Sequence, residues 1–270
     1  MRRNSPLTET GSFTNNPAGS LPDVSITPTC GWDMLRAIDL YRMVLTDMGI
    51  DYNVEWDASL TACLIARSAG LREPLEVLEE LASIVKDKEV YVLGAGPSLL
   101  NKELRFREDD VVFCADGACS PVEGEAMVIS VTDLDGGIEP ADRVYNMGGY
   151  VVLHIHGDNY RNIAINIDLI RKWGKRILIT VQTLPPCSSV TVIPGFTDGD
   201  RAYLLALSLE ARRIITIGMD LLSEVSTAFS KKIYSKYGYS TINKLRKLRW
   251  GYRIIDSLRY GVLNPQTIHR

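Results

Sequence analysis

The hydrophobic pattern changes character near residue 89. Beyond that point, six short runs rich in β-branched residues end at or near a Gly, Asp, Thr or His, at residues 90–94, 111–115, 127–131, 151–155, 176–181 and 213–218. Segments with helical spacing, such as residues 159–173 and 200–211, separate several of these runs. Continuous apolar strands alternating with helices are typical of a parallel sheet covered on both faces. The pattern predicts an α/β fold with a mostly parallel, doubly wound, Rossmann-like sheet.

The first third of the chain is predicted to be helical after an irregular start. Residues 1–30 are rich in Ser, Thr, Asn, Pro and Gly without apolar periodicity, which predicts a flexible tail or an arm laid on the surface. Apolar positions recur at helical spacing in residues 32–49, 57–69 and 73–86, and the last segment places Leu75, Leu78, Ala82 and Val85 along one stripe. We expect a helical cap at residues 31–87 and an α/β domain at residues 88–270.

The chain becomes basic and helical after Asp220, which predicts basic C-terminal helices. The cationic residues there include Lys231, Lys232, Lys236, Lys244, Arg246, Lys247, Arg249 and Arg253. The apolar positions predicted to form a buried stripe are Ile242, Leu245, Leu248, Tyr252 and Ile255. We interpret the basic positions as a solvated face, and a phosphate clamp is the alternative.

Composition and charge narrow the class of protein. A chain of 270 residues, 46% of them hydrophobic, can bury a sizeable core. The formal net charge of -3 argues against a general nucleic-acid binder, whereas a small anionic ligand needs only a local basic patch. No run approaches the roughly 20 apolar residues of a membrane helix, and the start of the chain lacks the apolar stretch of a signal peptide. We expect a cytoplasmic protein with no nucleic-acid or membrane partner.

The cysteines suggest neither a metal site nor a disulfide framework. They are scattered, odd in number and never spaced as C-x-x-C, at Cys30, Cys63, Cys114, Cys119 and Cys187. We therefore expect ordinary reduced thiols.

A glycine turn follows the first predicted strand directly. In the segment Gly94-Ala95-Gly96-Pro97-Ser98 the glycines permit a tight turn, and the Pro-Ser pair suits the start of a helix. Free N–H groups at a helix start attract phosphate. Leu99 stands where a dinucleotide fingerprint needs its third Gly, and no G-K-[ST] follows, so neither that fingerprint nor a Walker loop is present. A plain strand-to-helix turn is the alternative interpretation.

Aspartates follow several of the predicted strands. Asp116, with Gly117 after it, lies about 20 residues beyond the glycines, where an acid often binds ribose and where NAD binding would be favoured. Further carboxylates follow at Asp133, Asp135, Asp198 and Asp200. Gathered at one sheet edge, these groups would repel each other unless a divalent cation neutralised them, and magnesium binds carboxylates together with substrate phosphates. The alternative for each single Asp is helix N-capping.

Two histidines lie two residues apart on the fourth predicted strand. The spacing of His154 and His156 points both rings to one face, and Gly157-Asp158-Asn159 follows. We favour hydrogen bonding to substrate or phosphate over a transition-metal site, because no third His or Cys ligand is nearby. At the end of the next strand, Gln182 and Thr183 can offer amide and hydroxyl contacts to a heterocycle.

The ordered motifs resemble a known family. The strings GAGPSL, ADGA, TDLDG, HIHGDN, TVQT, GFTDGDRA and GMD, in this order, resemble the archaeal 6-hydroxymethyl-7,8-dihydropterin pyrophosphokinases over roughly residues 32–258. The order is also similar to that of thiamine pyrophosphokinase-like proteins and of the much longer motility accessory factors. One departure is visible: after Gly218-Met219-Asp220 the family tends to continue with an aromatic and a glycine, whereas this chain has Leu221 and Leu222.

The resemblance implies an ATP-dependent diphosphokinase. Its reaction moves the β,γ-diphosphate of ATP to the hydroxymethyl group of a reduced pterin, with Mg²⁺ as cofactor, in tetrahydromethanopterin or folate biosynthesis. It implies that residues 88–270 form a nucleotide-binding catalytic domain. The nucleotide site comprises Gly94, Ala95, Gly96, Pro97, Ser98, Asp116 and Gly117. The metal-binding catalytic residues are Asp133, Asp135 and Asp198, and the contacts to pterin or phosphate are His156, Asp158, Asn159, Gln182 and Phe196.

Three other functions stay open from the sequence. A nucleotide-sugar-dependent glycosyltransferase of the motility accessory factor type would use the same phosphate and metal groups. A nucleotide-binding oxidoreductase would bind NAD without magnesium, and a non-catalytic sensor would bind ATP without turnover. The partners expected here are small molecules, ATP and a reduced pterin, and a homo-oligomer is compatible with the sequence.

Overall fold

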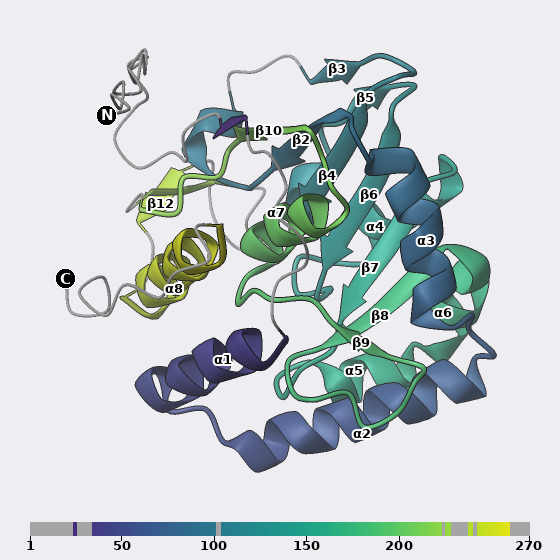
Figure 1. Cartoon of the computed structure of the whole chain (residues 1–270), viewed down its shortest axis with the longest axis vertical. Coiled ribbons are helices and arrows are strands. Elements are labelled where there is room, and N and C mark those ends of the chain that lie inside the picture. Colours follow the sequence, from purple (N-terminus) through teal and green to yellow (C-terminus); the bar gives the residue numbers. More distant parts are fainter. Residues whose placement is uncertain are drawn as a thin grey trace, which may run out of the picture.

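A central parallel sheet organises the molecule. The computed structural model describes residues 24–25, 34–100, 104–222, 225–227, 237–239 and 242–259. Its main sheet has the order β1-β10-β2-β4-β6-β7-β8-β9, and all neighbours are parallel except β1 and β10 (Figure 1). The strands are β1 (Val24–Ser25), β2 (Glu89–Leu93), β4 (Val111–Ala115), β6 (Met127–Thr132), β7 (Tyr150–His154), β8 (Ile177–Val181), β9 (Thr191–Val192) and β10 (Arg213–Ile217). The predicted fold class is confirmed, and all six predicted strands form.

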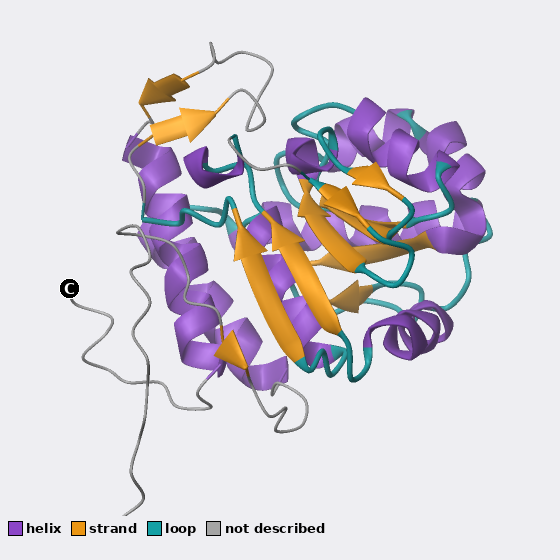
Figure 2. Cartoon of the chain, turned by 90° about the horizontal axis from the view of Figure 1, so that it is seen from above, coloured by secondary structure: helices purple, strands orange, loops and turns teal. Residues whose placement is uncertain are grey.

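Helices cover both faces of the sheet, as a doubly wound fold requires (Figure 2). One layer contains α1 (Met34–Met48), α3 (Pro74–Val85), α7 (Asp198–Ser208) and α8 (Ile242–Arg259); the other contains α2 (Tyr52–Ser68), α4 (Glu139–Asn146), α5 (Tyr160–Ile165) and α6 (Ile167–Trp173). Alternate strand residues supply the two cores: Val152 packs on the first side, whereas Val151 and Leu153 pack on the second. The strands are therefore buried on both faces, which explains their continuous apolar runs.

The strand order contains a switch point beside β2. From β2 the chain builds the sheet outward through β4, β6, β7, β8 and β9, and then returns to add β10 on the other side of β2. In folds of this kind, ligands bind at the carboxyl ends of the strands beside such a switch point. The glycine turn predicted from the sequence lies at this point.

The remaining described elements are short. They are the 3₁₀ helices η1 (Pro97–Leu99), η2 (Asp116–Cys119) and η3 (Gly174–Arg176), the parallel pair β3 (Arg105–Phe106) and β5 (Glu123–Gly124), and the antiparallel pair β11 (Val225–Thr227) and β12 (Tyr237–Tyr239). None of the helices in the described residues is long and apolar enough to cross a membrane.

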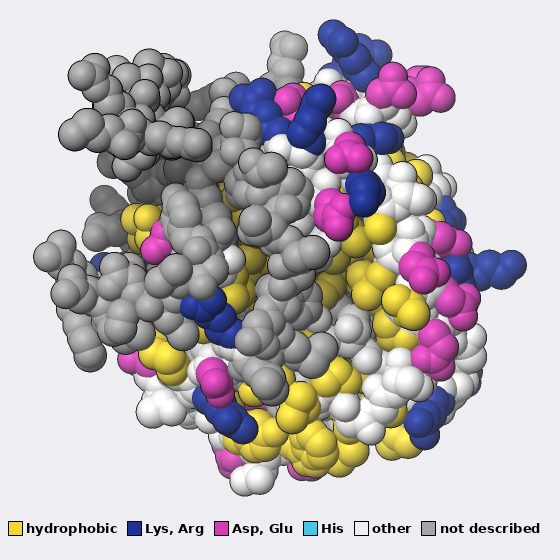
Figure 3. Space-filling model, in the orientation of Figure 1, with side chains coloured by type: hydrophobic (Ala, Val, Ile, Leu, Met, Phe, Trp, Pro, Cys, Tyr) yellow, Lys and Arg dark blue, Asp and Glu magenta, His cyan; other side chains and the backbone are white. Residues whose placement is uncertain are grey.

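Helix α3 forms where expected, and most of its predicted stripe faces the core: Val85 is buried, and Leu78 and Ala82 are half-buried against the core. The predicted stripe is wrong at Leu75, which is 66% exposed, whereas Val77 and Leu81 are buried. Both sets recur at helical spacing, so the spacing alone cannot choose between them. Charged side chains of both signs gather over the face of the molecule where α3 lies (Figure 3), and Arg72 forms ion pairs with Glu76 and Glu80 there.

Three other predicted helices change in detail. Helix α2 starts at Tyr52, five residues earlier than expected, because Asp51 caps it by accepting from the Asn53 N–H at 2.9 Å. The single helix predicted at residues 159–173 is divided at Asn166 into α5 and α6. Helix α8 buries Trp250, Ile254 and Ile255, but Ile242 is 79% exposed, so the predicted stripe is wrong at its first position. It is the one α-helix described beyond Asp220.

Little of the N-terminal segment can be compared with expectation, whereas the cysteines differ from it. Residues 1–30 lie outside the described residues except for β1, which pairs antiparallel with β10. The expectation of reduced thiols is wrong for four cysteines, because Cys63 pairs with Cys187 and Cys114 with Cys119. Cys63 and Cys187 are 124 residues apart in the sequence. They come close because α2 packs near β8, which the sequence spacing does not reveal.

Candidate active site

A cavity of about 540 Å³ lies at the carboxyl ends of the strands. Its walls come from the loops after β2, β4, β6, β7, β8 and β10, from the start of α7, and from parts of α1, α2 and α8. Eleven of the predicted site residues line it: Gly94, Ala95, Gly96, Asp116, Asp133, Asp135, His156, Asp158, Gln182, Phe196 and Asp198. Pro97, Ser98, Gly117 and Asn159 are absent from its described lining.

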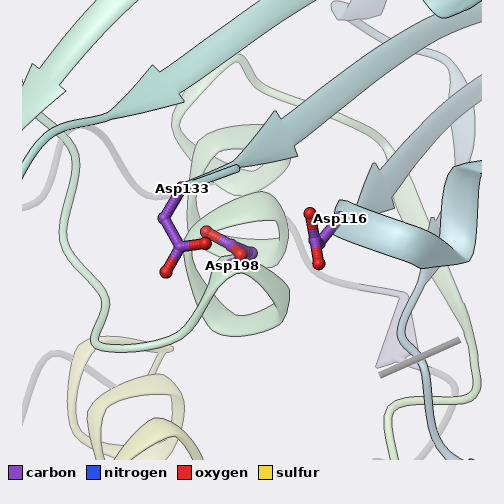
Figure 4. Close-up of side chains that lie close together, drawn as sticks. All are labelled: Asp116, Asp133 and Asp198. Carbon is purple, nitrogen blue, oxygen red and sulfur yellow. The ribbon is translucent and has the colours of Figure 1, made fainter. Parts of the chain in front are cut away.

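Three aspartates converge in this cavity (Figure 4). Asp116 follows β4, Asp133 follows β6 and Asp198 begins α7, and one carboxylate oxygen from each lies within 4.8 Å of the others. We call these three residues the carboxylate triad. The sequence placed Asp135 in the metal group and Asp116 in the nucleotide site, whereas the structure brings Asp116 together with Asp133 and Asp198.

A tight turn separates Asp135 from the triad. Asp133 Oδ1 accepts from the Asp135 N–H at 2.8 Å, and Leu134 between them has a positive φ of 65°. Asp135 is consequently exposed, although it still lines the cavity. The sequence could not show this difference, because an alternating D-x-D pattern is compatible with either arrangement.

Burial and neighbouring charges shift the pKa values of all three carboxyl groups of the triad. Burial, followed by the charge of Asp133, raises the pKa of Asp116 to about 7, and the same two causes raise that of Asp198 well above its ordinary value. For Asp133 burial acts upward, but the hydrogen bond and charge of His156 outweigh it and lower the pKa. Three carboxylate oxygens at this spacing suit a hard divalent cation such as Mg²⁺, which would remove the repulsion.

A buried arginine lies beside the triad and forms an ion pair with one of its carboxylates. Arg201 is 1% exposed, and its Nη1 lies 3.8 Å from Asp198 Oδ1. Its Nη2 donates to Gly195 O at 3.1 Å and contacts His154 Nε2 at 3.2 Å. Because a guanidinium group can only donate, His154 Nε2 must accept this hydrogen bond. The proton of the neutral His154 ring is then on Nδ1, which lies 2.9 Å from Thr180 Oγ1. Burial and then Arg201 lower the pKa of His154.

His154 is therefore a neutral, structural histidine, while His156 faces the cavity. The two rings stack with centroids 5.6 Å apart, and His156 Nε2 lies 3.4 Å from Asp133 Oδ2. Both nitrogens of His154 are already engaged, which argues against a transition-metal site built on the pair. Arg201 was not predicted as a site residue, although it stands three positions after Asp198 on the same helix.

Asn159 holds the strand ends in place. Its Nδ2 donates to the carbonyls of Asp133 at 3.0 Å and His154 at 2.8 Å, and its Oδ1 accepts from the His156 N–H at 2.8 Å. The amide thus ties the ends of β6 and β7 together. This geometry favours a positioning role over the direct substrate contact predicted from the sequence.

The glycine turn is bound to the end of β10. The N–H of Gly94 donates to Ile217 O and that of Gly96 to Gly218 O, both at 2.8 Å. A Cβ at either glycine would lie 2.5 Å from Gly218 O, so this close approach accounts for both glycines. The helix expected at Pro97 is only the 3₁₀ turn η1.

Asp220 caps the turn. Its Oδ2 accepts from the Ser98 N–H at 2.8 Å and its Oδ1 accepts from Ser98 Oγ at 3.0 Å, while Ser98 Oγ accepts from the Gly218 N–H at 3.0 Å. The N–H predicted to face phosphate is therefore engaged by a carboxylate. By contrast, Asp200 fulfils the helix-capping alternative, since it accepts from the N–H groups of Phe196 at 2.8 Å and Thr197 at 2.6 Å.

Two lysines and a glutamate from outside the predicted site residues also line the cavity. Lys244 and Lys247 of α8 line it, and Lys247 Nζ lies 5.8 Å from the centroid of the Phe196 ring. This placement favours the phosphate-clamp interpretation of the basic helix. The glutamate is Glu55 of α2, which is 4% exposed. No local sequence motif predicts Glu55 as a site residue, because it reaches the cavity through the packing of α2, which is far in sequence from the other site residues.

The fold and the cavity define a Rossmann-like α/β protein with a carboxylate triad at its ligand-binding edge. Comparisons with known sequences place it more closely. The sequence profile of the family described as 6-hydroxymethylpterin diphosphokinase MptE-like matches residues 68–224. This chain belongs to that family.

Curated relatives carry one name. The chain is 34% identical over 224 residues to the 6-hydroxymethyl-7,8-dihydropterin pyrophosphokinase of Methanothermobacter thermautotrophicus, covering 81% of this chain and 91% of the relative. Identity to the proteins of the same name is 32% in Pyrococcus furiosus, covering 81% and 91%, and 27% in Methanocaldococcus jannaschii, covering 84% and 96%.

Proposed function

We propose that this protein transfers the β,γ-diphosphate of ATP to the hydroxymethyl group of 6-hydroxymethyl-7,8-dihydropterin, in pterin cofactor biosynthesis. The observation that carries the proposal is the carboxylate triad inside a cavity, in a chain whose curated relatives bear the name of this activity. Phosphoryl transfer needs positioning and charge neutralisation more than covalent help, and the cavity offers both.

The reaction breaks one bond and forms one. The hydroxymethyl oxygen of the pterin attacks the β-phosphorus of ATP, and the bond between that phosphorus and the oxygen bridging to the α-phosphate breaks. AMP leaves with the bridging oxygen, the hydroxyl proton is released, and the pterin carries the diphosphate. Negative charge builds on the phosphate oxygens during this step, so cationic groups around them lower the barrier.

The triad would hold the magnesium ion. Asp116, Asp133 and Asp198 supply the hard oxygen ligands that Mg²⁺ prefers. A bound Mg²⁺ supplies charge neutralisation and orientation for the phosphates. Arg201 keeps the Asp198 carboxylate in place, and Asn159 fixes the backbone of Asp133. Asp135 is exposed beside the triad, and we assign it an outer position at the proposed metal site.

The strand order supports a division of the cavity between the two substrates. Along the sheet edge the glycine turn after β2 comes first, Asp116 after β4 and Asp133 after β6 follow, and His156 after β7 and Gln182 after β8 come last. We assign ATP to the side of the glycine turn and the pterin to the side of β7 and β8. Lys244 and Lys247, on the α8 wall, are placed to contact the triphosphate.

The alternative functions receive less support. An NAD-dependent oxidoreductase would leave Asp116 available to ribose, whereas here it accepts from Thr132 Oγ1 at 2.9 Å and belongs to the triad. A glycosyltransferase of the motility accessory factor type is less supported, because the three curated relatives all bear the pyrophosphokinase name. Because ATP is the phosphate donor, we place the reaction in the cytoplasm.

One assay separates these functions. Purified protein is incubated with ATP, Mg²⁺ and 6-hydroxymethyl-7,8-dihydropterin, and nucleotides are separated by chromatography; parallel tubes contain CMP-sugars or lack the pterin. We expect AMP only when the pterin is present. Release of CMP would support the glycosyltransferase instead, and ATP binding without AMP would indicate a sensor.

A further inference from the structure

The α1–α2 wall of the cavity combines apolar side chains with one carboxylate. It contributes Met48, Ile50 and Glu55 to the lining, and Phe196 lies nearby with its ring centroid 6.4 Å from that of the buried Tyr41. Apolar and aromatic side chains of this kind suit a flat ring better than a phosphate chain. A single carboxylate among them then determines which ring fits.

Glu55 is buried and half satisfied. It is 4% exposed, its Oε1 accepts from the Gly157 N–H at 3.1 Å, and its Oε2 has no hydrogen-bond partner among the described residues. The Tyr41 hydroxyl lies beside Glu55, close enough to lower the pKa of that carboxyl, but its geometry does not complete a hydrogen bond in the described structure. Burial nevertheless raises the pKa of Glu55. Leaving such a group unpaired is costly, and the cost disappears when a ligand donates to it.

The position of Glu55 sets the orientation of that ligand. Its bond to Gly157 fixes it at the end of β7, three strands from the glycine turn after β2, or roughly 14 Å at ordinary strand spacing. The triad lies between them, at the ends of β4 and β6. A ligand anchored at Glu55 can therefore reach the triad with its opposite end.

We propose that Glu55 recognises the amino-pyrimidinone edge of the reduced pterin, accepting hydrogen bonds from its N3–H and 2-amino group. These two adjacent donors match a carboxylate, and the hydroxymethyl-bearing carbon lies at the other end of the bicyclic ring, which faces the triad. This assignment rests on the proposed function and adds the residue that selects the substrate ring.

The substitution Glu55→Gln tests the assignment with little change in shape. Glutamine can still accept from the Gly157 N–H, so a purely structural role is preserved, but it places an amide NH₂ against the ring donors. We expect the KM for the pterin to rise about 10- to 100-fold while the KM for ATP stays unchanged. The matched control is Asp57→Asn, an exposed acid on the same helix, with no change in either KM.

A substrate analogue gives an independent measurement. In 6-hydroxymethyl-7,8-dihydrolumazine an oxygen replaces the 2-amino group, which sets an acceptor against the Glu55 carboxylate. The wild-type enzyme should prefer the pterin strongly, and Glu55→Gln should lose most of that preference because its amide can donate to the new oxygen. If the variant fails to fold, as a melting curve would show, the wild-type preference alone decides.

The outcomes separate the two proposals. AMP formation by the wild type together with an unchanged pterin KM in Glu55→Gln overturns the Glu55 assignment and leaves the function intact. Equal use of pterin and lumazine by the wild type does the same. No AMP from the wild type overturns the proposed function and this inference with it.

Discussion

The two ends of the cavity differ in whether their polar groups are hydrogen-bonded within the protein. At the glycine turn the N–H groups of Gly94, Gly96 and Ser98 all donate within the protein, to β10 and Asp220. At the α1–α2 wall Glu55 Oε2 and the Tyr41 hydroxyl are buried without a completed hydrogen bond among the described residues. The first region is built as a closed scaffold, whereas the second has bonds left for a ligand. This contrast is the basis for proposing that the pterin ring is recognised at the second region.

The triad lies between these regions and should show the largest effect. We expect Asp133→Asn and Asp116→Asn to lower turnover by at least about 100-fold with the fold intact, because asparagine keeps the shape but removes the charge that holds a cation. Asp135→Asn is the matched comparison, and its smaller effect would separate the triad from its exposed neighbour. The rate of AMP formation at limiting magnesium measures the effect of all three substitutions. Equal turnover rates in Asp116→Asn and the wild type would show that Asp116 does not take part in metal binding.

The glycine turn should respond in stability before it responds in binding. Gly96→Val places a Cβ within 2.3 Å of Asp220 Oδ2 and 2.5 Å of Gly218 O, so we expect a loss of about 1–3 kcal/mol in the free energy of unfolding. Weaker ATP binding should accompany this loss. Chemical denaturation with isothermal titration of ATP measures both. A variant as stable as the wild type would show that the two loops are not held together as described.

Magnesium should stabilise the protein more at high pH than at low pH. The folded pKa of Asp116 is raised from 3.8 to about 7, so its ionisation costs stability, and without a cation stability falls as pH rises through that window. A bound cation removes the cost, whereas at low pH protons compete with it. We expect a larger magnesium-induced rise in melting temperature at pH 8 than at pH 5.5. Equal shifts, or none, would count against the triad as the site.

Removing residues 1–25 should have the smallest effect. The truncation deletes the edge strand β1, which pairs with only Arg213 and Ile214 of β10, and neither of these two residues lines the cavity. We expect turnover near that of the full chain and a slightly lower melting temperature. A large fall in melting temperature would mean that the β1–β10 pairing supports the switch point beside β2.

Local features were predictable from the sequence and long-range ones were not. The six strands were predicted because β-branched runs determine a buried strand locally, and the loops after them therefore gathered the expected aspartates at one edge. The choice between Asp116 and Asp135 depended on a turn with positive φ at Leu134. Glu55 and Arg201 escaped because their roles arise from packing of α2 and α7 against the sheet, which leaves no sequence string.

The central claim is that diphosphate is transferred at the carboxylate triad, and one measurement tests it most directly. Metal-free protein is mixed with ATP and 6-hydroxymethyl-7,8-dihydropterin, magnesium is added, and AMP and pterin diphosphate are quantified over time for the wild type and Asp133→Asn. We predict equal amounts of the two products, formed only after magnesium is added and almost absent in the variant. Formation of ADP with a pterin monophosphate, or wild-type rates in Asp133→Asn, would contradict the account.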